Sequence, residues 1–186
     1  MDERVCVFID GSNLDRAIDQ VFHKRIKVEG LARKLVEDRR LMKIYYYEAP
    51  LIANVNKDSF DGQQRFFERL RRDPYFELRL GRRVERNRVF KCTHCGETCE
   101  GRTWEQKGVD TLIVFDLITL AIRNVYDTAI ILAGDEDFIT PFLEVRMLGK
   151  TVENAFTEYG WAPRLREVAD GETVLDKDFL DGFWRK

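Results

Sequence analysis

The chain has 186 residues, 44% of them hydrophobic and 34% charged, which is typical of a folded globular domain and excludes a disordered chain. Its formal net charge is −2, and its longest apolar run, at 111–122, is too short and too interrupted to span a bilayer. No secretory leader pattern precedes the first strand pattern, so we expect a cytoplasmic protein whose four cysteines stay reduced.

The first half of the chain alternates between strand-like and helix-like patterns. Short apolar or β-branched runs predict strands, and apolar residues three and four positions apart predict helices. Ser12, with Asp15 three residues later, has the spacing of a capping box and would open the first helix. The expected elements are a strand at 4–9, helices at 12–22 and 29–38, a strand at 42–49 that Pro50 ends, a helix at 58–72 and a strand at 75–80.

The second half continues the alternation after an insertion. Residues 84–91 suggest a ribbon that leads into a cysteine-containing insertion at about 82–105. After Gly108 the expected elements are a helix at 111–123, a strand at 128–133, a helix at 136–148, a strand at 151–156 and a short helix at 163–169. Strands that alternate with helices predict an α/β fold of three layers, with a mostly parallel central sheet flanked by helices. We expect one domain over residues 1–186.

Most aromatic side chains are expected in the core. The tyrosines at 45–47 favour a buried strand with one exposed ring, and stacking on nucleobases is the alternative. Core packing is also expected for Cys6, Trp104 and Trp161.

Four aspartates stand where a strand pattern gives way to a helix pattern. Asp10 follows the first strand, Asp110 opens the helix after Gly108, and Asp135 and Asp137 follow the strand at 128–133. The carboxyl ends of parallel strands meet at one edge of a sheet, so these side chains are expected to converge there. Clustered carboxylates repel one another and suit a hard cation such as Mg²⁺ or Mn²⁺.

Each aspartate also has a purely structural explanation. Asp110 and Asp135 are good N-cap residues, and Asp137 in a first helical turn would complement the helix dipole. Ser, Thr or Asn would cap equally well without mutual repulsion, so the group of four favours a metal site. Asn13, close to Asp10, is expected to orient a phosphate or a water molecule, although a polar first-turn residue needs no such role.

Basic residues concentrate in the middle of the chain. Between Arg65 and Lys91 there are ten basic and four acidic residues, so this stretch carries +6 and the remainder −8. Such a stretch beside an acidic pocket would hold a polyanion, and a solvated arginine-rich face is the alternative. The residues expected to contact an RNA backbone are Arg82, Arg83, Arg86 and Arg88.

The cysteine segment KCTHCGETCEG is a second chemical signal. Cys92, Cys95 and Cys99 are candidate zinc ligands because two cysteines separated by two residues are a common half-site for structural Zn²⁺. No fourth ligand is evident in the sequence, and a loop of free thiols is the alternative. In the zinc interpretation the metal would stiffen the insertion beside the basic ribbon.

Three motifs in series give the chain a resemblance to a known family. They are IDGSNL, KGVD with Asp116 six residues after its aspartate, and LAGDEDFITPFLEVRMLGKTVE. Together they resemble the NYN domain, in the LabA-like (DUF88) branch of the PIN-like nuclease superfamily. The resemblance implies a PIN-like sheet and an acidic site at Asp10, Asp110, Asp135 and Asp137 accompanied by Asn13. Asp116 lies on another helical face from Asp110 and is expected to be structural or supporting.

These observations predict an Mg²⁺- or Mn²⁺-dependent endoribonuclease that hydrolyses RNA phosphodiester bonds. Its partner would be RNA and not a membrane, and a homodimer is compatible with the sequence. The alternatives are a non-catalytic RNA-binding or regulatory protein that retains the acidic metal pocket, and a phosphatase that uses the same crevice.

Overall fold

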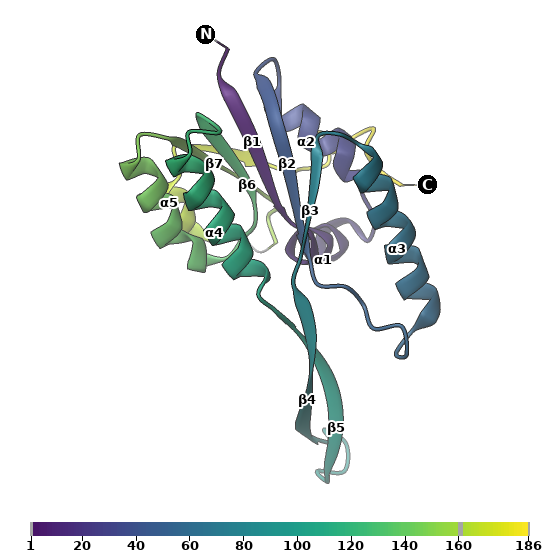
Figure 1. The fold of residues 1–186 in the computed structure, drawn as a ribbon. Helices are drawn as coiled ribbons and strands as arrows, with labels where there is room; N and C mark the ends of the chain where they lie inside the picture. Colours follow the sequence, from purple (N-terminus) through teal and green to yellow (C-terminus); the bar gives the residue numbers. More distant parts are fainter. Residues whose placement is uncertain (1, 160–161, 186) are drawn as a thin grey trace.

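The computed structural model describes residues 2–159 and 162–185, which form a sheet flanked by helices and one long hairpin (Figure 1). In chain order the elements are β1 (Arg4–Asp10), α1 (Gly11–Phe22), α2 (Val28–Val36), β2 (Arg40–Glu48), α3 (Lys57–Arg72), β3 (Phe76–Leu80), β4 (Arg82–Lys91), β5 (Thr98–Lys107), α4 (Val109–Ile122), β6 (Thr128–Leu132), the 3₁₀ helix η1 (Glu136–Phe138), α5 (Ile139–Met147), β7 (Thr151–Phe156), α6 (Pro163–Val168) and β8 (Gly171–Val174).

The central sheet has six strands in the order β3-β2-β1-β6-β7-β8, and every neighbouring pair is parallel. The predicted α/β fold with a mostly parallel sheet is therefore confirmed. The chain winds outward from β1 through β2 to β3 and then returns to place β6 on the other side of β1. This reversal creates a topological switch point at the carboxyl ends of β1 and β6, where open α/β sheets bind their ligands.

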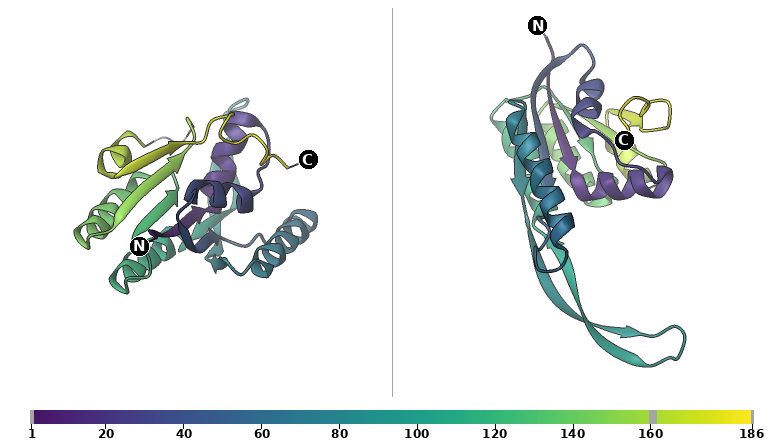
Figure 2. Two further views of the ribbon diagram at one scale, coloured as in Figure 1. Left: turned by 90° about the horizontal axis from the view of Figure 1, so that it is seen from above. Right: turned by 90° about the vertical axis from the view of Figure 1, so that its right-hand side faces the viewer.

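Both faces of the sheet are covered, which accounts for the near-continuous apolar runs of its strands. Alternate β1 residues enter two separate cores: Val5, Val7 and Ile9 pack under α1, α2 and α3, while Cys6 and Phe8 pack under α4 and α5. The views in Figure 2 show these helical layers on opposite sides of the strands. Cys6 is fully buried, as predicted. Among the described residues, none of the helices is both long enough and apolar enough to span a membrane.

The two-sided core also corrects one prediction. Tyr45, Tyr46 and Tyr47 are all buried, so no ring of this run is exposed for stacking. The hydroxyl of Tyr46 lies so close to Gly11 that a Cβ there would be 2.3 Å from it. Glycine is therefore required where α1 leaves β1 and crosses β2 at close range.

The start of α1 differs from the expected capping box. Its N-cap is Asp10, whose carboxylate accepts a hydrogen bond from Asn13 N at 3.0 Å. Ser12 instead hydrogen-bonds Glu48, and Asp15 forms an ion pair with Arg25 at 3.0 Å. The capping-box interpretation is wrong because the chain enters the helix two residues earlier than Ser12 would require.

Near the C-terminus two further elements were not expected. The helix at 136–148 is divided into η1 and α5, and β8 lies at the edge of the sheet within the segment read only as a tail.

The segment between β3 and α4 forms a hairpin arm, defined as residues 82–107. Its strands β4 and β5 pair in antiparallel register from Arg82 opposite Lys107 to Lys91 opposite Thr98. The ribbon expected at 84–91 is thus part of a much longer hairpin, which projects away from the sheet (Figures 1 and 2). Trp104 lies on this arm, half-buried and outside the core, because the arm has no second layer to cover it. Trp161 is outside the described residues.

Candidate active site at the sheet edge

The candidate site lies where β1 and β6 end side by side. Ile9 pairs with Leu132, so the next residue of each strand, Asp10 and Ala133, reaches the same edge. The hairpin arm begins directly after β3 and returns to α4, so its base lies at this edge as well. Three segments distant in sequence therefore meet around one crevice.

Asp10 is the most buried of the four candidate aspartates, with 6% of its surface exposed. Burial, helped by the charges of Asp110 and Asp135, raises the pKa of its carboxyl group to about 6, against the hydrogen bond from Asn13 N. A carboxylate in this position is charged at neutral pH at a cost in free energy. A bound cation would offset that cost.

Asp110 stands in the first turn of α4 but does not cap it. The N-cap is Gly108, whose φ of 84° turns the chain sharply into the helix. The Asp110 side chain reaches solvent, yet neighbouring atoms partly desolvate its carboxyl group, and this effect together with the charges of Asp135 and Asp137 raises its pKa. The N-cap role expected for Asp110 is therefore wrong, and its carboxylate is left unoccupied by capping.

Asp135 and Asp137 occupy the turn after β6 and are both exposed. Asp135 caps η1, as predicted, by accepting a hydrogen bond from Asp137 N at 3.0 Å. Asn13 connects this turn to α1, because its Oδ1 accepts a hydrogen bond from Gly134 N at 3.2 Å. With the carbonyl oxygen so engaged, the Asn13 amide nitrogen retains two N–H donors for an anionic group.

Asn154 is a supporting residue that the sequence reading missed. It is buried in β7, and its Nδ2 donates to the carbonyl oxygens of Ile131 at 3.0 Å and Ala133 at 2.9 Å. These two bonds fix the end of β6, from which the acidic turn departs. A polar amide inside the otherwise strand-like run at 151–156 was the available signal.

Glu48 is a second missed residue, at the end of β2 next to Asp10. It is buried with 6% exposure, and its Oε1 accepts hydrogen bonds from Ser12 Oγ at 2.6 Å and Ala49 N at 3.0 Å. Burial raises the pKa of Glu48 despite these bonds. Gln106 Oε1, at the base of the arm, lies 2.9 Å from the same Ser12 hydroxyl. A glutamate that ends a strand, like Asp10, was the signal in the sequence.

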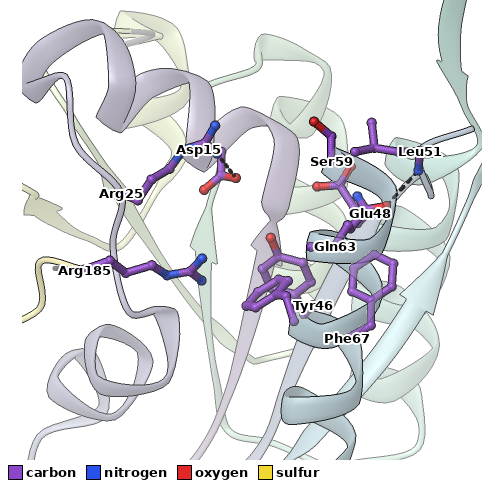
Figure 3. A pocket seen from close by; sticks show the side chains of 11 residues that line it. Asp15, Arg25, Tyr46, Glu48, Leu51, Ser59, Gln63, Phe67 and Arg185 are labelled. Atoms are coloured by element: carbon purple, nitrogen blue, oxygen red, sulfur yellow. Dashed lines mark hydrogen bonds and ion pairs between the residues drawn. The ribbon is translucent and has the colours of Figure 1, made fainter. Parts of the chain in front are cut away.

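Cavities lie on both sides of α1. One, of about 410 Å³, has Glu48 and Tyr46 on one wall and Asp15, Arg25 and Arg185 on the other (Figure 3). The other, of about 450 Å³, is lined by Asn13, Arg16, Gly134 and Asp135, among others. Of these two cavities, only the second is lined by residues of the acidic turn.

Asp116 lies outside this cluster. It is buried beneath the sheet, and its Oδ2 accepts hydrogen bonds from Tyr47 Oη and Arg79 Nε, both at 3.0 Å. The expectation of a structural role, on another helical face from Asp110, agrees with these contacts.

The basic residues of the arm differ in whether they contact an acidic or carbonyl group. On the arm, Glu105 accepts a hydrogen bond from Arg88 at 2.5 Å and lies 3.7 Å from Arg86, while Arg83 bonds the carbonyl of Ala49. Arg82 is exposed directly opposite Lys107 at the base of the arm, next to the turn that holds Asp110. Like charges in opposed positions repel each other, so this pair favours an anion between them.

The carboxylates provide the oxygen ligands that Mg²⁺ and Mn²⁺ prefer. Within residues 2–159 and 162–185, the hydrogen bonds join none of Asp10, Asp110, Asp135 and Asp137 to a basic side chain, and no three acidic, histidine or cysteine side chains are gathered closely enough to hold a metal ion together. Mg²⁺ is usually bound through one or two carboxylates with water completing its shell, so an open arrangement fits this class of ion. The donor chemistry therefore suits the ion.

Comparison with known proteins supplies a family and a fold. The family model of the NYN domain matches residues 4–176. Among solved structures, the crystal structure of a protein of unknown function from Vibrio parahaemolyticus RIMD 2210633 is similar, with a TM-score of 0.71 and 18% sequence identity. The similarity covers 99% of this chain and 97% of that one, and at such low identity it shows the fold alone. No curated protein matches the chain.

Proposed function

The chain belongs to the NYN domain family, and we propose that it is a metal-dependent endoribonuclease of the PIN-like superfamily, in the LabA-like (DUF88) branch. The observation that carries the proposal is the convergence of Asp10, Asp110 and Asp135 at the switch point of the sheet, where the charges of Asp110 and Asp135 raise the pKa of Asp10 and the charge of Asp135 raises that of Asp110. Such proximity of carboxylates without basic partners favours a cation site over independent structural roles.

In this proposal Asp10, Asp110, Asp135 and Asp137 hold Mg²⁺ or Mn²⁺. The ion would supply Lewis acidity, which lowers the pKa of water and neutralises charge on a phosphodiester. No side chain is needed as a nucleophile. Asn13 directs its amide N–H groups at the phosphate, since its carbonyl oxygen is already held by Gly134 N.

The base of the arm would hold the RNA backbone. Arg82 and Lys107 lie next to the turn at Gly108 that leads to Asp110, and their two neighbouring positive charges would attract a phosphate group. Arg83, Arg86 and Arg88 extend the positive surface along the arm, although Glu105 partly neutralises the last two. Binding should therefore weaken as the salt concentration rises.

The test is RNA cleavage in Mn²⁺ or Mg²⁺, with single-stranded and structured substrates, by the parent protein and by Asp10→Asn combined with Asp135→Asn. We expect the double variant to lose at least about 100-fold in rate, because the charge that holds the ion is removed while Asn still caps both helices. Asp38→Asn is the matched control, since Asp38 is exposed in the turn before β2, at the opposite edge of the sheet.

Undiminished cleavage by the double variant would sink the proposed site. RNA binding without cleavage in any divalent metal would instead identify a non-catalytic RNA-binding protein. Hydrolysis of mononucleotides in preference to RNA would identify a phosphatase.

A further inference from the structure

The tip of the hairpin arm is shaped by its cysteines. Cys92 N donates to Glu97 O at 2.7 Å, which extends the pairing of β4 and β5 by one residue beyond Lys91 and Thr98. Gly96 N then donates to Cys92 O at 2.9 Å, and Gly96 has a φ of 75°, a value that most residues avoid. The chain thus reverses within a tight loop between Cys92 and Glu97.

The sulfur of Cys92 is held inside this loop. Cys95 N lies 3.5 Å from Cys92 Sγ and donates to it. A sulfur that accepts a hydrogen bond from the backbone amide of a second cysteine resembles one half of a structural zinc site.

Cys99 and Glu97 complete the set from the opposite strand. Cys99 pairs with Phe90, two residues before Cys92, so it is a diagonal neighbour of Cys92 on the same face of the hairpin. Glu97 is directly opposite Cys92, and its Oε2 lies 4.0 Å from Cys95 Sγ. Three sulfurs and one carboxylate therefore lie within the eight residues 92–99 at the tip of the hairpin.

The arm makes few stabilising contacts of its own, so a cross-link at its tip would stabilise it. Its strands are paired only with each other, and its outer residues, from Glu85 to Glu100, are mostly exposed. An isolated two-stranded hairpin is marginally stable in water because it buries little apolar surface. Three exposed thiols are also a liability to oxidation unless they are bound.

We propose that the tip of the arm binds one Zn²⁺ through Cys92, Cys95, Cys99 and Glu97. Because the described side chains are not yet gathered around one point, binding includes rotation of the side chains and loss of the thiol protons. The bound ion would lock the ends of β4 and β5 together and hold the arm straight. Zinc binding at the tip would not require nuclease activity, since β4 and β5 carry the tip away from the central sheet (Figure 1).

The first test is elemental analysis of full-length protein purified in reducing buffer without added metal, followed by Co²⁺ titration of metal-stripped protein. We expect about one zinc per chain, and Co²⁺ should give a sulfur-to-metal charge-transfer band together with the visible absorption of tetrahedral Co²⁺. Amide exchange in the arm should slow when zinc is added, while exchange in β1 should not change. This readout is independent of cleavage.

Variants then assign the ligands. Cys95→Ser and Cys99→Ser should each lower zinc affinity by on the order of 100-fold or more, and Glu97→Gln should lower it less. Cys6→Ala is the matched control, because Cys6 is buried in β1 and should leave metal content unchanged. His94→Ala should also bind zinc as the parent does.

Protein without zinc and without a Co²⁺ spectrum would overturn the proposal, as would a Cys92–Cys95 disulfide in the freshly purified chain. Parental affinity in Cys99→Ser would overturn the site as described. If His94→Ala lost its zinc while Glu97→Gln bound zinc as tightly as the parent protein, the assignment of Glu97 as a ligand would be overturned.

Discussion

Two carboxylates of this protein each accept a hydrogen bond from an arginine side chain. One, Asp116, lies between the layers of the sheet and its helices, and the other, Glu105, lies on the arm. Asp116 is buried and receives hydrogen bonds from Arg79 and Tyr47. Glu105 lies on β5 beside Arg86 and Arg88, whose side chains are 53% and 59% exposed. The contacts of Asp116 are partly removed from water and join α4 to β2 and β3. The contacts of Glu105 remain solvated and join β4 and β5, which already pair through their backbones.

This difference separates two kinds of charge. Buried charge in the layers fixes positions, and its loss would be measured as stability. Exposed charge on the arm contributes little to folding and remains available to a partner of opposite sign. The candidate active site lies between the two, with buried Asp10 and Glu48 on one side and exposed Asp135 and Asp137 on the other.

The largest effect should come from removing the buried member of this comparison. Asp116→Ala should lower the free energy of unfolding by about 3 kcal/mol, because it leaves the Tyr47 hydroxyl and the Arg79 guanidinium without their acceptor. Glu105→Ala, which removes an equivalent acceptor from the arm, should change it by less than about 0.5 kcal/mol. Urea unfolding followed by circular dichroism measures both, and equal losses would contradict the distinction.

A smaller effect of opposite sign is expected at the candidate site. The pKa of Asp10 is raised from 3.8 to about 6, so the folded protein retains a proton there that the unfolded chain has released. The contribution of Asp10 to stability is therefore greatest below pH 4 and is lost as the pH rises through 6. At pH 7.5 without divalent metal, Asp10→Asn should raise the free energy of unfolding by roughly 2 kcal/mol.

The increase in the free energy of unfolding caused by Asp10→Asn should largely disappear at pH 4. At pH 7.5, Mg²⁺ should reduce the difference between the two proteins, because it would stabilise only the parent protein. Asp137→Asn is the control, because its carboxylate is exposed and should change stability by less than about 0.5 kcal/mol. If Asp10→Asn were destabilising at pH 7.5, the carboxylate would be a structural cap and not a strained ligand.

Much of the fold was predictable because its strands are short apolar runs and its helices are regular. The strand at 151–156 was predicted at its observed bounds, and most other elements lie within two residues of expectation. β8 was missed since its residues Gly171–Val174 are only partly buried at an edge and show no apolar run. The exposed ring expected at 45–47 failed for a tertiary reason, because helices cover both faces of β2.

The candidate site was less accessible to sequence reasoning. Strand ends pointed to Asp10 and Asp135, and the structure places them close enough that the charge of Asp135 raises the pKa of Asp10. The helix start at Asp110 depends on the left-handed Gly108, which sequence alone does not distinguish from an ordinary turn. Glu48 and Asn154 act through contacts with residues about 20 to 40 positions away, so the local signals, a glutamate at a strand end and an amide within a strand, did not reveal their roles.

The smallest effect should be found on the exposed side of the comparison. Arg82→Gln should weaken RNA binding only a few-fold and reduce the slope of log affinity against log salt by about 0.7, the value for one phosphate contact with a single strand. Arg123→Gln removes the same charge at the far end of α4, away from the acidic edge, and should leave the slope unchanged. Fluorescence anisotropy with Asp10→Asn as the background prevents cleavage during the titration. Equal slopes for the two arginine variants would mean that RNA responds to net charge alone. A lower slope for Arg82→Gln alone would place the RNA backbone at the base of the arm, close to the carboxylates proposed to hold the catalytic ion.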